Sequence, residues 1–362
     1  MMSIDPLETN NIHSDLNEDF LDYAMARCFG DLHFKVDPAT GMKAIIAIHN
    51  TNLGPALGGC RFITYPDTKS ALQDAMRLAR GMSYKAALTN LPLGGGKSVI
   101  IKPSGDYDRH AYLETFGQFV NELNGRYITA LDSGTDLSDM EIINRHTPYV
   151  ASLSRYNGDP SPYTSLGVLR GIQAAVEFKL NKDNLEGLHV AVQGLGHVGF
   201  LLAKHLHELG VRLTVADIDE EKVNEAVKSF GAEVVATDII HKVPCDVFAP
   251  CALGAIINDV TINQLQTTII AGAANNQLAR TYHGQQLHEK GILYAIDYVI
   301  NAGGLIFAAS KYLNTPEEQV QRQIDGIGKA LIEIFTRAQH ENQPVSVIAD
   351  TLAQEKIARV QP

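Results

Sequence analysis

The feature that most constrains the fold is a glycine pattern between a short apolar segment and an amphipathic one. Gly194-Leu-Gly-His-Val-Gly199 follows His189–Gln193 and precedes 200–209. The first segment has the apolar, β-branched character of a buried strand, whereas the second has helical spacing of its leucines. A further apolar segment, Arg212–Ala216, comes next and ends at Asp217. A strand, a glycine turn, a helix and a second strand in this order predict a parallel βαβ unit.

Each glycine of this pattern has a separate role in binding a dinucleotide. Gly194 permits a tight turn, Gly196 lets the backbone approach a pyrophosphate, and Gly199 lets the helix pack closely on the strand. The pyrophosphate would bind the free N–H groups of a helix N-terminus. Asp217 can accept hydrogen bonds from a ribose diol and would repel a 2′-phosphate, which predicts NAD rather than NADP. The predicted cofactor-binding loop is Gly194, Leu195, Gly196, His197, Val198 and Gly199, with no separate role for the His197 side chain.

Length and pattern predict two α/β domains. A chain of 362 residues is too long for one ordinary core. Residues 1–150 mix helical segments with apolar strands, including 97–101, and a turn-rich loop is expected at 54–59. After a loop dense in turn formers at 157–162, helices and short apolar strands alternate. We therefore expect a mixed-sheet domain, then a Rossmann-type, doubly wound domain over 151–340.

Charge and composition exclude several classes of protein. A net charge of −11 disfavours nucleic acid and anionic lipid as partners, so a small molecule is expected. No apolar run reaches the length of a membrane span, and residues 1–20 lack the apolar core of a signal peptide. Cys28, Cys60, Cys245 and Cys251 form no C-x-x-C pair. They are expected to be reduced thiols of a cytoplasmic protein without a metal site.

The run Gly94-Gly-Gly-Lys97-Ser98 superficially matches a phosphate-binding P-loop. That motif requires glycine where this chain has Leu91, and a helix where Ser98 opens an apolar strand, so an NTPase is rejected. Three residues without side chains could pack against a ligand, and Lys97 after them would be partly desolvated. Desolvation lowers a lysine pKa towards the range of a general base. The alternative is a lysine whose ammonium reaches solvent.

Lys85 lies just past a predicted helix at 68–83, at a position where a lysine is unexpected. It continues an apolar stripe at the next helical step; the stripe is Ala71, Ala75, Leu78 and Met82. A buried ammonium requires an anionic partner, and Asp132, just past an apolar strand, is the candidate. Two lysines and one aspartate could together hold an amino acid.

At this point the chain resembles the Glu/Leu/Phe/Val dehydrogenase family, and most of all its leucine-specific members. The segments that carry the resemblance are 40–60, 78–87, 93–101, 125–135, 194–199, 249–255, 271–278 and 297–304. The resemblance implies two domains with the active site in the cleft between them, residues 341–362 packing back on 1–150, and a homo-oligomer, either octamer or dimer.

The resemblance also implies roles for matching residues. Lys97 corresponds to the base that acts through a water, Lys85 to the lysine that grips the substrate α-carboxylate, and Asp132 to the aspartate that handles the amino group and protons. Asn276 would contact the substrate carboxylate from the nucleotide side and Thr164 would orient the nicotinamide carboxamide. The nicotinamide ribose would be lined by Ala249, Pro250 and Cys251.

Substrate choice is the last expectation. Glutamate-specific relatives carry a lysine at the position of Leu57 and a serine at that of Ala308, so a glutamate carboxylate would be buried unpaired. The expected side-chain pocket comprises Leu57, Gly58, Ala130, Leu305 and Ala308. Leucine dehydrogenases typically have valine at the last two positions, where this chain has Leu305 and Ala308, so one wall of the pocket is larger and another is smaller. A methylene changes discrimination by only ~1–3 kcal/mol. A leucine-like substrate is expected, and an aromatic one is the alternative. Leu131 and Asp136 also depart from the family, which commonly has an acid and a threonine there.

Two rival functions keep this fold. One is an NADH-dependent enzyme that runs mainly as a reductive aminase, and the other is a non-catalytic NAD-binding regulator. The second rival predicts NAD binding without turnover, and no functional effect of replacing Lys97.

Overall fold

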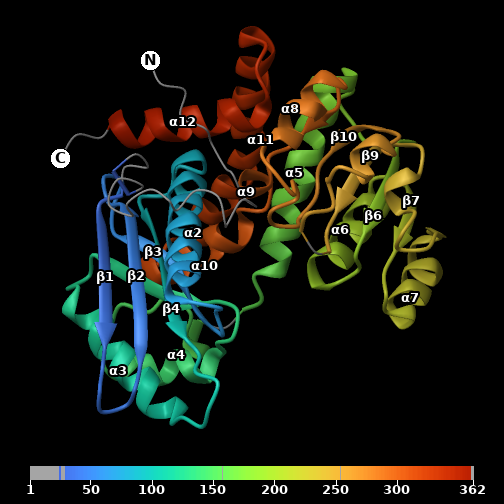
Figure 1. Ribbon diagram of the computed structural model, residues 1–362. Helices are drawn as coiled ribbons and strands as arrows, with labels where there is room; N and C mark the ends of the chain where they lie inside the picture. The colour runs from blue at the N-terminus through green and yellow to red at the C-terminus, as the bar shows by residue number, and fades with distance from the viewer. Residues whose placement is uncertain (1–23, 26–28, 157, 253, 360–362) are drawn as a thin grey trace. The chain divides into compact units, whose positions relative to one another are not determined.

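The computed structural model describes residues 24–25, 29–156, 158–252 and 254–359 (Figure 1). The chain forms two compact units. The described residues of 11–158, 308–315 and 353–362 form what we call the first unit, and those of 159–307 and 316–352 form the second unit. The predicted domains, 1–150 with 341–362 and 151–340, differ from these units at 151–158, 308–315 and 341–352.

The first unit is built on a five-stranded mixed sheet in the order β1-β2-β4-β3-β5. Its strands are β1 (Asp31–Val36), β2 (Lys43–Asn50), β3 (Ala56–Ile63), β4 (Gly94–Ile101) and β5 (Tyr127–Leu131). β2 is antiparallel to β1 and β4, whereas β3 is parallel to β4 and β5. The mixed sheet is confirmed, but the loop predicted at 54–59 is wrong, because β3 already begins at Ala56 and pairs on both sides.

Helices cover both faces of this sheet. Helix α2 (Thr68–Leu88) packs on β2 and β4, and a cluster of small apolar side chains fills that layer. Helices α3 (Arg109–Glu122) and α4 (Leu137–Asn144) enclose a larger core on the opposite face. The strand register places Leu57, Gly59 and Lys97 on the face covered by α2.

The three glycines before Lys97 belong to β4 rather than to a ligand-facing loop, which corrects the sequence interpretation. A Cβ on Gly95 would lie 2.0 Å from the backbone nitrogen of Ser83 on α2. A Cβ on Gly96 would lie 2.7 Å from the ring of Tyr127. These glycines let a helix and an aromatic ring approach the strand, and they thereby fix the depth at which Lys97 is buried.

The second unit contains a six-stranded sheet in the order β11-β10-β9-β6-β7-β8, with every pair parallel. Its strands are β6 (His189–Gln193), β7 (Arg212–Ala216), β8 (Glu233–Val234), β9 (Cys245–Pro250), β10 (Thr267–Ile270) and β11 (Leu293–Tyr294). The predicted doubly wound parallel sheet is confirmed. Its strand order reverses between β6 and β9, the point where such sheets bind ligands at their carboxyl edge.

The remaining helices are α5 (Ser161–Leu180), α6 (His197–Glu208), α7 (Glu220–Phe230), α8 (Tyr282–Glu289), α9 (Asp297–Ile300), α10 (Gly303–Leu313), α11 (Glu317–Glu341) and α12 (Val345–Arg359). Helix α5 packs against α6 and the long α11. The end of α12 belongs to the first unit, where Gln354 donates to the Tyr84 hydroxyl at 2.8 Å. No helix in the described part of the chain is both long enough and apolar enough to cross a membrane.

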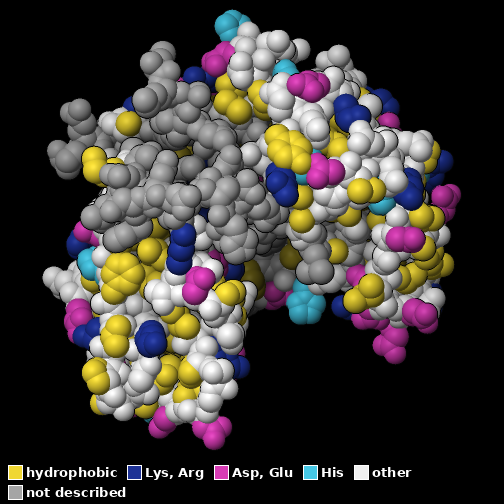
Figure 2. Space-filling view, viewed as in Figure 1, with side chains coloured by type: hydrophobic (Ala, Val, Ile, Leu, Met, Phe, Trp, Pro, Cys, Tyr) yellow, Lys and Arg dark blue, Asp and Glu magenta, His cyan; other side chains and the backbone are white. Residues whose placement is uncertain are grey.

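Charged side chains are dispersed on the surface. On the face shown in Figure 2, lysine and arginine side chains stand among acidic and apolar ones. Of the cysteines, Cys60 is buried and Cys245 and Cys251 are half-buried, all as free thiols, whereas Cys28 lies outside the described residues.

Candidate active site

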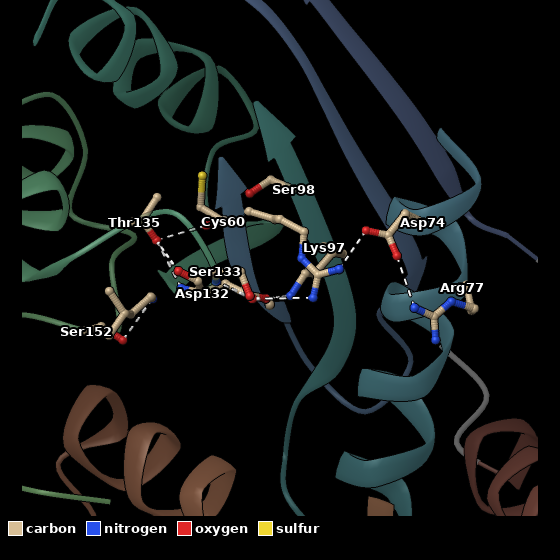
Figure 3. A network of polar contacts seen from close by, with 12 residues as sticks. Cys60, Asp74, Arg77, Lys97, Ser98, Asp132, Ser133, Thr135 and Ser152 are labelled. Carbon is tan, nitrogen blue, oxygen red and sulfur yellow. Dashed lines mark hydrogen bonds and ion pairs between the residues drawn. The ribbon is translucent and has the colours of Figure 1, made fainter. Parts of the chain in front are cut away.

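The centre of the candidate site is an ion pair between Lys97 on β4 and Asp132 directly after β5 (Figure 3). Strand β3 lies between these two strands, so the aspartate must reach across it. Gly59 of β3 makes this possible, because a Cβ there would lie 2.7 Å from Asp132 Cβ and 2.8 Å from Asp132 Oδ2. The sequence interpretation missed Gly59. Gly59 was interpreted as part of the loop at 54–59, so its place in a strand opposite Lys97 was not expected.

A tight turn holds Asp132 in place. The backbone N–H of Asp132 donates to Thr135 Oγ1 at 3.0 Å. The same hydroxyl lies 2.9 Å from the Asp132 carbonyl oxygen and 3.0 Å from that of Cys60, either of which can accept its proton. Phe62 N–H donates to the Ser133 carbonyl at 2.9 Å, tying the turn to β3. The carboxylate is therefore preorganised against Lys97.

Burial sets the protonation of Lys97. The residue is only 5% exposed, so its side chain does not reach solvent. Burial, and after it the positive charge of Arg61, lowers the pKa of Lys97 to about 7 against the opposing charge of Asp74. A lysine with this pKa is partly neutral near pH 7 and can accept a proton, as a general base must.

A second carboxylate extends the network through Arg61, a residue that the sequence interpretation missed. Arg61 Nη1 donates to Asp74 Oδ2 at 2.7 Å, and its Nη2 lies 3.5 Å from Asp132 Oδ1. Tyr65 Oη donates to Asp74 Oδ2 at 2.6 Å. Arg77 Nη2 donates to Asp74 Oδ1 at 3.1 Å (Figure 3). Arg61 was overlooked because the region before it was interpreted as a loop, which hides the alternation that places it beside Lys97.

Lys85 lies half-buried in the last turn of α2. The predicted stripe was partly wrong: Leu78 and Met82 are also half-buried, and the buried line runs through Ala71, Ala75 and Ala79. Lys85 therefore does not replace a core residue. Helical spacing puts it on the face that also carries Asp74.

The pocket residues predicted on β3 and β5, Leu57, Gly58 and Ala130, are buried. Leu57 and Ala130 lie on the face of the sheet that also carries Lys97. Gly58 points to the opposite face, and its carbonyl accepts a hydrogen bond from Tyr127 Oη at 2.7 Å. Two of these three residues therefore lie on the Lys97 face.

Asp136 and Leu131 are the two positions at which the chain departs from the family pattern. Asp136 is the N-cap of α4: its Oδ1 accepts from Asp139 N–H at 3.0 Å, and Asp139 Oδ2 accepts from Asp136 N–H at 2.9 Å. A threonine can cap a helix in the same way, which accounts for the exchange. Leu131 is 42% exposed, and nothing in the structure explains it.

The glycine loop of the second unit fits a dinucleotide. Gly194 has φ +96°, and a Cβ on Gly199 would lie 2.0 Å from the Gly194 carbonyl oxygen, so turn and packing both require glycine. A Cβ on Gly196 would meet nothing within 4 Å, which leaves space above the start of α6. Gly196 offers no side-chain cap to the first N–H groups of that helix. The loop can therefore present N–H groups to a pyrophosphate.

Asp217 closes one side of this loop. It follows β7, and its carboxylate accepts hydrogen bonds from Leu195 N–H and, at 2.9 Å, from Asp219 N–H. These bonds orient the carboxylate while leaving lone pairs for a ribose. Leu195 is fully buried and can offer only its backbone, whereas His197 is exposed and Val198 half-buried.

The ends of β9 and β10 hold the next predicted residues. Ala249 and Pro250 are buried in β9, so their contribution to a ligand is limited to backbone atoms. Cys251 is half-buried, and burial raises the pKa of its thiol to about 11, which keeps it protonated near neutral pH. Its N–H donates to the Gln193 carbonyl at 2.7 Å, joining the ends of β9 and β6.

Asn276 is exposed on a braced loop. It has φ +50°, and its carbonyl accepts from Ala255 N–H at 2.7 Å. Gln277 N–H donates to Asp297 Oδ2 at 3.0 Å. Asn301 Nδ2 donates to the side chain of the neighbouring Asn275 at 2.6 Å. The bracing preorganises this loop.

Thr164, Leu305 and Ala308 complete the predicted set. Thr164 is half-buried on α5, where its hydroxyl donates to the Pro160 carbonyl at 3.0 Å. Leu305 and Ala308 are half-buried on α10, at a spacing that puts them on one face of the helix. Among the residues that the structure describes, no cluster of three His, Cys, Asp or Glu could hold a metal ion.

Comparison with known proteins shows similarity along most of the chain. Residues 30–149 match the family model for the Glu/Leu/Phe/Val dehydrogenase dimerisation domain, and residues 214–361 match the glutamate/leucine/phenylalanine/valine dehydrogenase model. A leucine dehydrogenase from Thermoactinomyces intermedius is 49% identical over 324 residues, which is 89% of this chain and 88% of that protein.

Relatives with another printed substrate are about as similar. An L-tryptophan dehydrogenase from Nostoc punctiforme is 48% identical over 319 residues, covering 88% of this chain and 90% of that protein. The crystal structure of L-tryptophan dehydrogenase from Nostoc punctiforme superposes with a TM-score of 0.87 at 44% identity, covering 94% of this chain and 99% of that one.

Proposed function

Because the chain belongs to the Glu/Leu/Phe/Val dehydrogenase family of amino-acid oxidoreductases, we propose that it deaminates an apolar, leucine-like L-amino acid with NAD. In the proposed reaction, L-amino acid, NAD⁺ and water give 2-oxo acid, ammonium, NADH and a proton, reversibly. The observation that carries the proposal is the buried Lys97–Asp132 pair, in which a lysine that is partly neutral at pH 7 meets a preorganised carboxylate.

The residues of the first unit divide the work. NAD, when bound, supplies the acceptor for the hydride that leaves Cα of the substrate. Lys85 is proposed to bind the α-carboxylate as a point charge. Neutral Lys97 removes a proton from the water that attacks the resulting iminium carbon, and Asp132 relays protons to and from the nitrogen as the carbinolamine collapses. In the second unit, Asn276 is proposed to contact the substrate carboxylate, as the family resemblance implies. Thr164 is proposed to contact the nicotinamide carboxamide on the same ground.

The apolar residues determine the substrate class. Leu57 and Ala130 present no group that could pair with a side-chain carboxylate, so burying one there would cost several kcal/mol. The leucine dehydrogenase relatives support a leucine-like substrate. The second candidate is an aromatic L-amino acid, favoured by the tryptophan dehydrogenase relative and by the small Ala308.

A panel of 2-oxo acids with ammonium and NADH tests this proposal. The acids correspond to leucine, valine, isoleucine, phenylalanine, tryptophan and glutamate, and turnover is followed as loss of NADH absorbance. We expect the highest kcat/KM with the leucine acid and at least ~100-fold less with the glutamate acid. Preference for an aromatic acid would select the second candidate, and no turnover of any acid would refute the enzyme proposed.

The preference for NAD is attributed to Asp217. Asp217→Ala removes the acceptor for a ribose diol and the charge that repels a 2′-phosphate, so KM for NAD should rise roughly 10–100-fold while NADP improves relative to NAD. Asp219→Ala is the matched control. It removes a neighbouring carboxylate that caps α7 by accepting from the Glu221 and Lys222 N–H groups. Steady-state kinetics with both dinucleotides measure the effect. An unchanged KM for NAD in Asp217→Ala would remove this residue from the cofactor site.

A homo-oligomer, dimer or octamer, is proposed as the assembly. The support is the match of residues 30–149 to a domain described as a dimerisation domain.

A further inference from the structure

Arg61 lies beside the proposed general base Lys97 and contacts two carboxylates. Its guanidinium lies between two carboxylates, 2.7 Å from Asp74 Oδ2 and 3.5 Å from Asp132 Oδ1. Its Nε is buried and has no partner among the residues that the structure describes. The shorter contact of Arg61 is with Asp74, and the longer one is with Asp132, the carboxylate that contacts Lys97.

Asp74, which anchors Arg61, is itself held through both of its carboxylate oxygens. Tyr65 donates to the oxygen of Asp74 that Arg61 contacts, and Arg77 donates to the other oxygen. Asp74 lies on α2 and Arg61 on β3, so the ion pair ties the helix to the strand. A guanidinium held in this way offers Asp132 a positive charge at a fixed place, because its planar fork can engage two carboxylates together.

Positive and negative side chains alternate from Lys97 to Asp74. Lys97 touches Asp132, Asp132 faces Arg61, and Arg61 is bound to Asp74. Without Arg61, Asp132 would be the undivided counter-ion of Lys97 and would favour its ammonium form, which cannot accept a proton. With Arg61 in place, Asp132 is shared between two cations.

We infer that Arg61 is a positioning residue: anchored on Asp74, it holds the Asp132 carboxylate in place and keeps Lys97 available as a base. This inference rests on the proposed function of Lys97 and Asp132. Neither Arg61 nor Asp74 belongs to the set of site residues expected from the sequence.

Other charged or titratable groups also surround Lys97. They are Cys60 and Arg61 on β3, Asp132 after β5, and Asp74 and Arg77 on α2. Helix α2 and strand β2, which pack against β4, also carry Lys85 and His49. Cys60 is buried and stays protonated, because burial raises the pKa of its thiol to about 12. Arg61 and Lys97 both form an ion pair with Asp132, so removing Arg61 changes how the charge of this carboxylate is shared.

Two substitutions of Arg61 separate charge from geometry. Arg61→Gln removes the charge, so kcat at pH 7 should fall about 10–100-fold and the pH at which kcat reaches half its plateau should move upward. Arg61→Lys keeps the charge but loses the fork, so kcat should fall while the pH profile stays near that of the wild type. A merely structural role would lower stability towards urea without moving the pH profile.

Arg126→Gln is the matched control. Arg126 precedes β5 of the same sheet and pairs with Asp31, so this variant loses one positive charge and one aspartate contact away from Lys97. It should keep wild-type kcat and pH profile. Asp74→Asn should lower kcat in wild-type protein but cause no further loss in Arg61→Gln, because both changes remove the same anchor.

The measurement is kcat for L-leucine oxidation against pH in these variants and in Lys97→Ala. Suppose that Lys97→Ala is inactive but Arg61→Gln has the same kcat and pH profile as Arg126→Gln. That result would overturn the inference about Arg61 and leave the proposed function standing. Wild-type kcat in Lys97→Ala would instead overturn the proposed function. If Arg61→Gln does not fold, Arg61→Lys decides: reduced kcat with wild-type stability towards urea supports the positioning role. Wild-type kcat, or a loss of kcat that accompanies a loss of stability, contradicts it.

Discussion

Replacing Lys97 with alanine is expected to lower kcat for L-leucine oxidation by on the order of 10²–10⁴-fold. The variant loses the amine that accepts a proton from the attacking water. The variant should still fold, because removing the lysine leaves the half-buried Asp132 carboxylate paired with Arg61. Steady-state NADH formation measures the loss, and KM for NAD should stay near that of the wild type because the dinucleotide loop lies in the other unit.

Lys102→Ala provides the control for this variant. Lys102 follows the same strand but is exposed, so removing it should leave kcat unchanged. A loss of less than about tenfold in Lys97→Ala would fall short of general-base catalysis and would exclude the lysine from that role.

Replacing Asp132 with asparagine is the second change with a large expected effect. Asparagine has nearly the same shape but cannot exchange protons, so kcat should fall on the order of 10²–10³-fold. The remaining activity should show a pH profile displaced to lower pH, because Lys97 loses its counter-ion and its ammonium form is disfavoured. This displacement is opposite in sign to that expected for Arg61→Gln.

Asp136→Asn is the comparison for Asp132→Asn. Asparagine can still cap α4, so this variant should keep both kcat and the wild-type pH profile. An Asp132→Asn enzyme with wild-type kcat would show that the carboxylate only supports the turn, and proton relay would need another group.

The parallel sheet of the second unit could be predicted closely. Strands β6 and β7 have the predicted bounds, since a short apolar run between turn-forming residues allows little else. The glycine roles depend on local backbone geometry that the pattern itself specifies, and φ +96° at Gly194 agrees with the predicted tight turn. Sequence patterns succeed where neighbours in the chain are also neighbours in space.

The first unit shows where such prediction stops. Gly95 and Gly96 suggested a ligand, yet the backbone of α2 and the ring of Tyr127 occupy the space they leave. Those partners are distant along the chain, and no local pattern identifies them. The buried stripe of α2 runs through Ala79 rather than Leu78, because the close approach to β4 selects small side chains over larger apolar ones.

The network around Asp132 was predicted in part. Lys97 and Asp132 were expected in one site and are in contact. Arg61 and Gly59 were not expected, because the register of β3 between β4 and β5 decides what faces Lys97. A parallel register of this kind is set by crossover connections and cannot be deduced from one strand.

The dependence of kcat on pH, with saturating L-leucine and NAD, tests whether Lys97 is the base. Wild-type kcat should rise with pH through about 7 and then level off, because Lys97 must be unprotonated to act. This rise of kcat with pH should be absent from the residual activity of Lys97→Ala. Two results would contradict the assignment of Lys97 as the base. One is a wild-type rise near ~10, the ordinary pKa of lysine, and the other is an unchanged rise in Lys97→Ala.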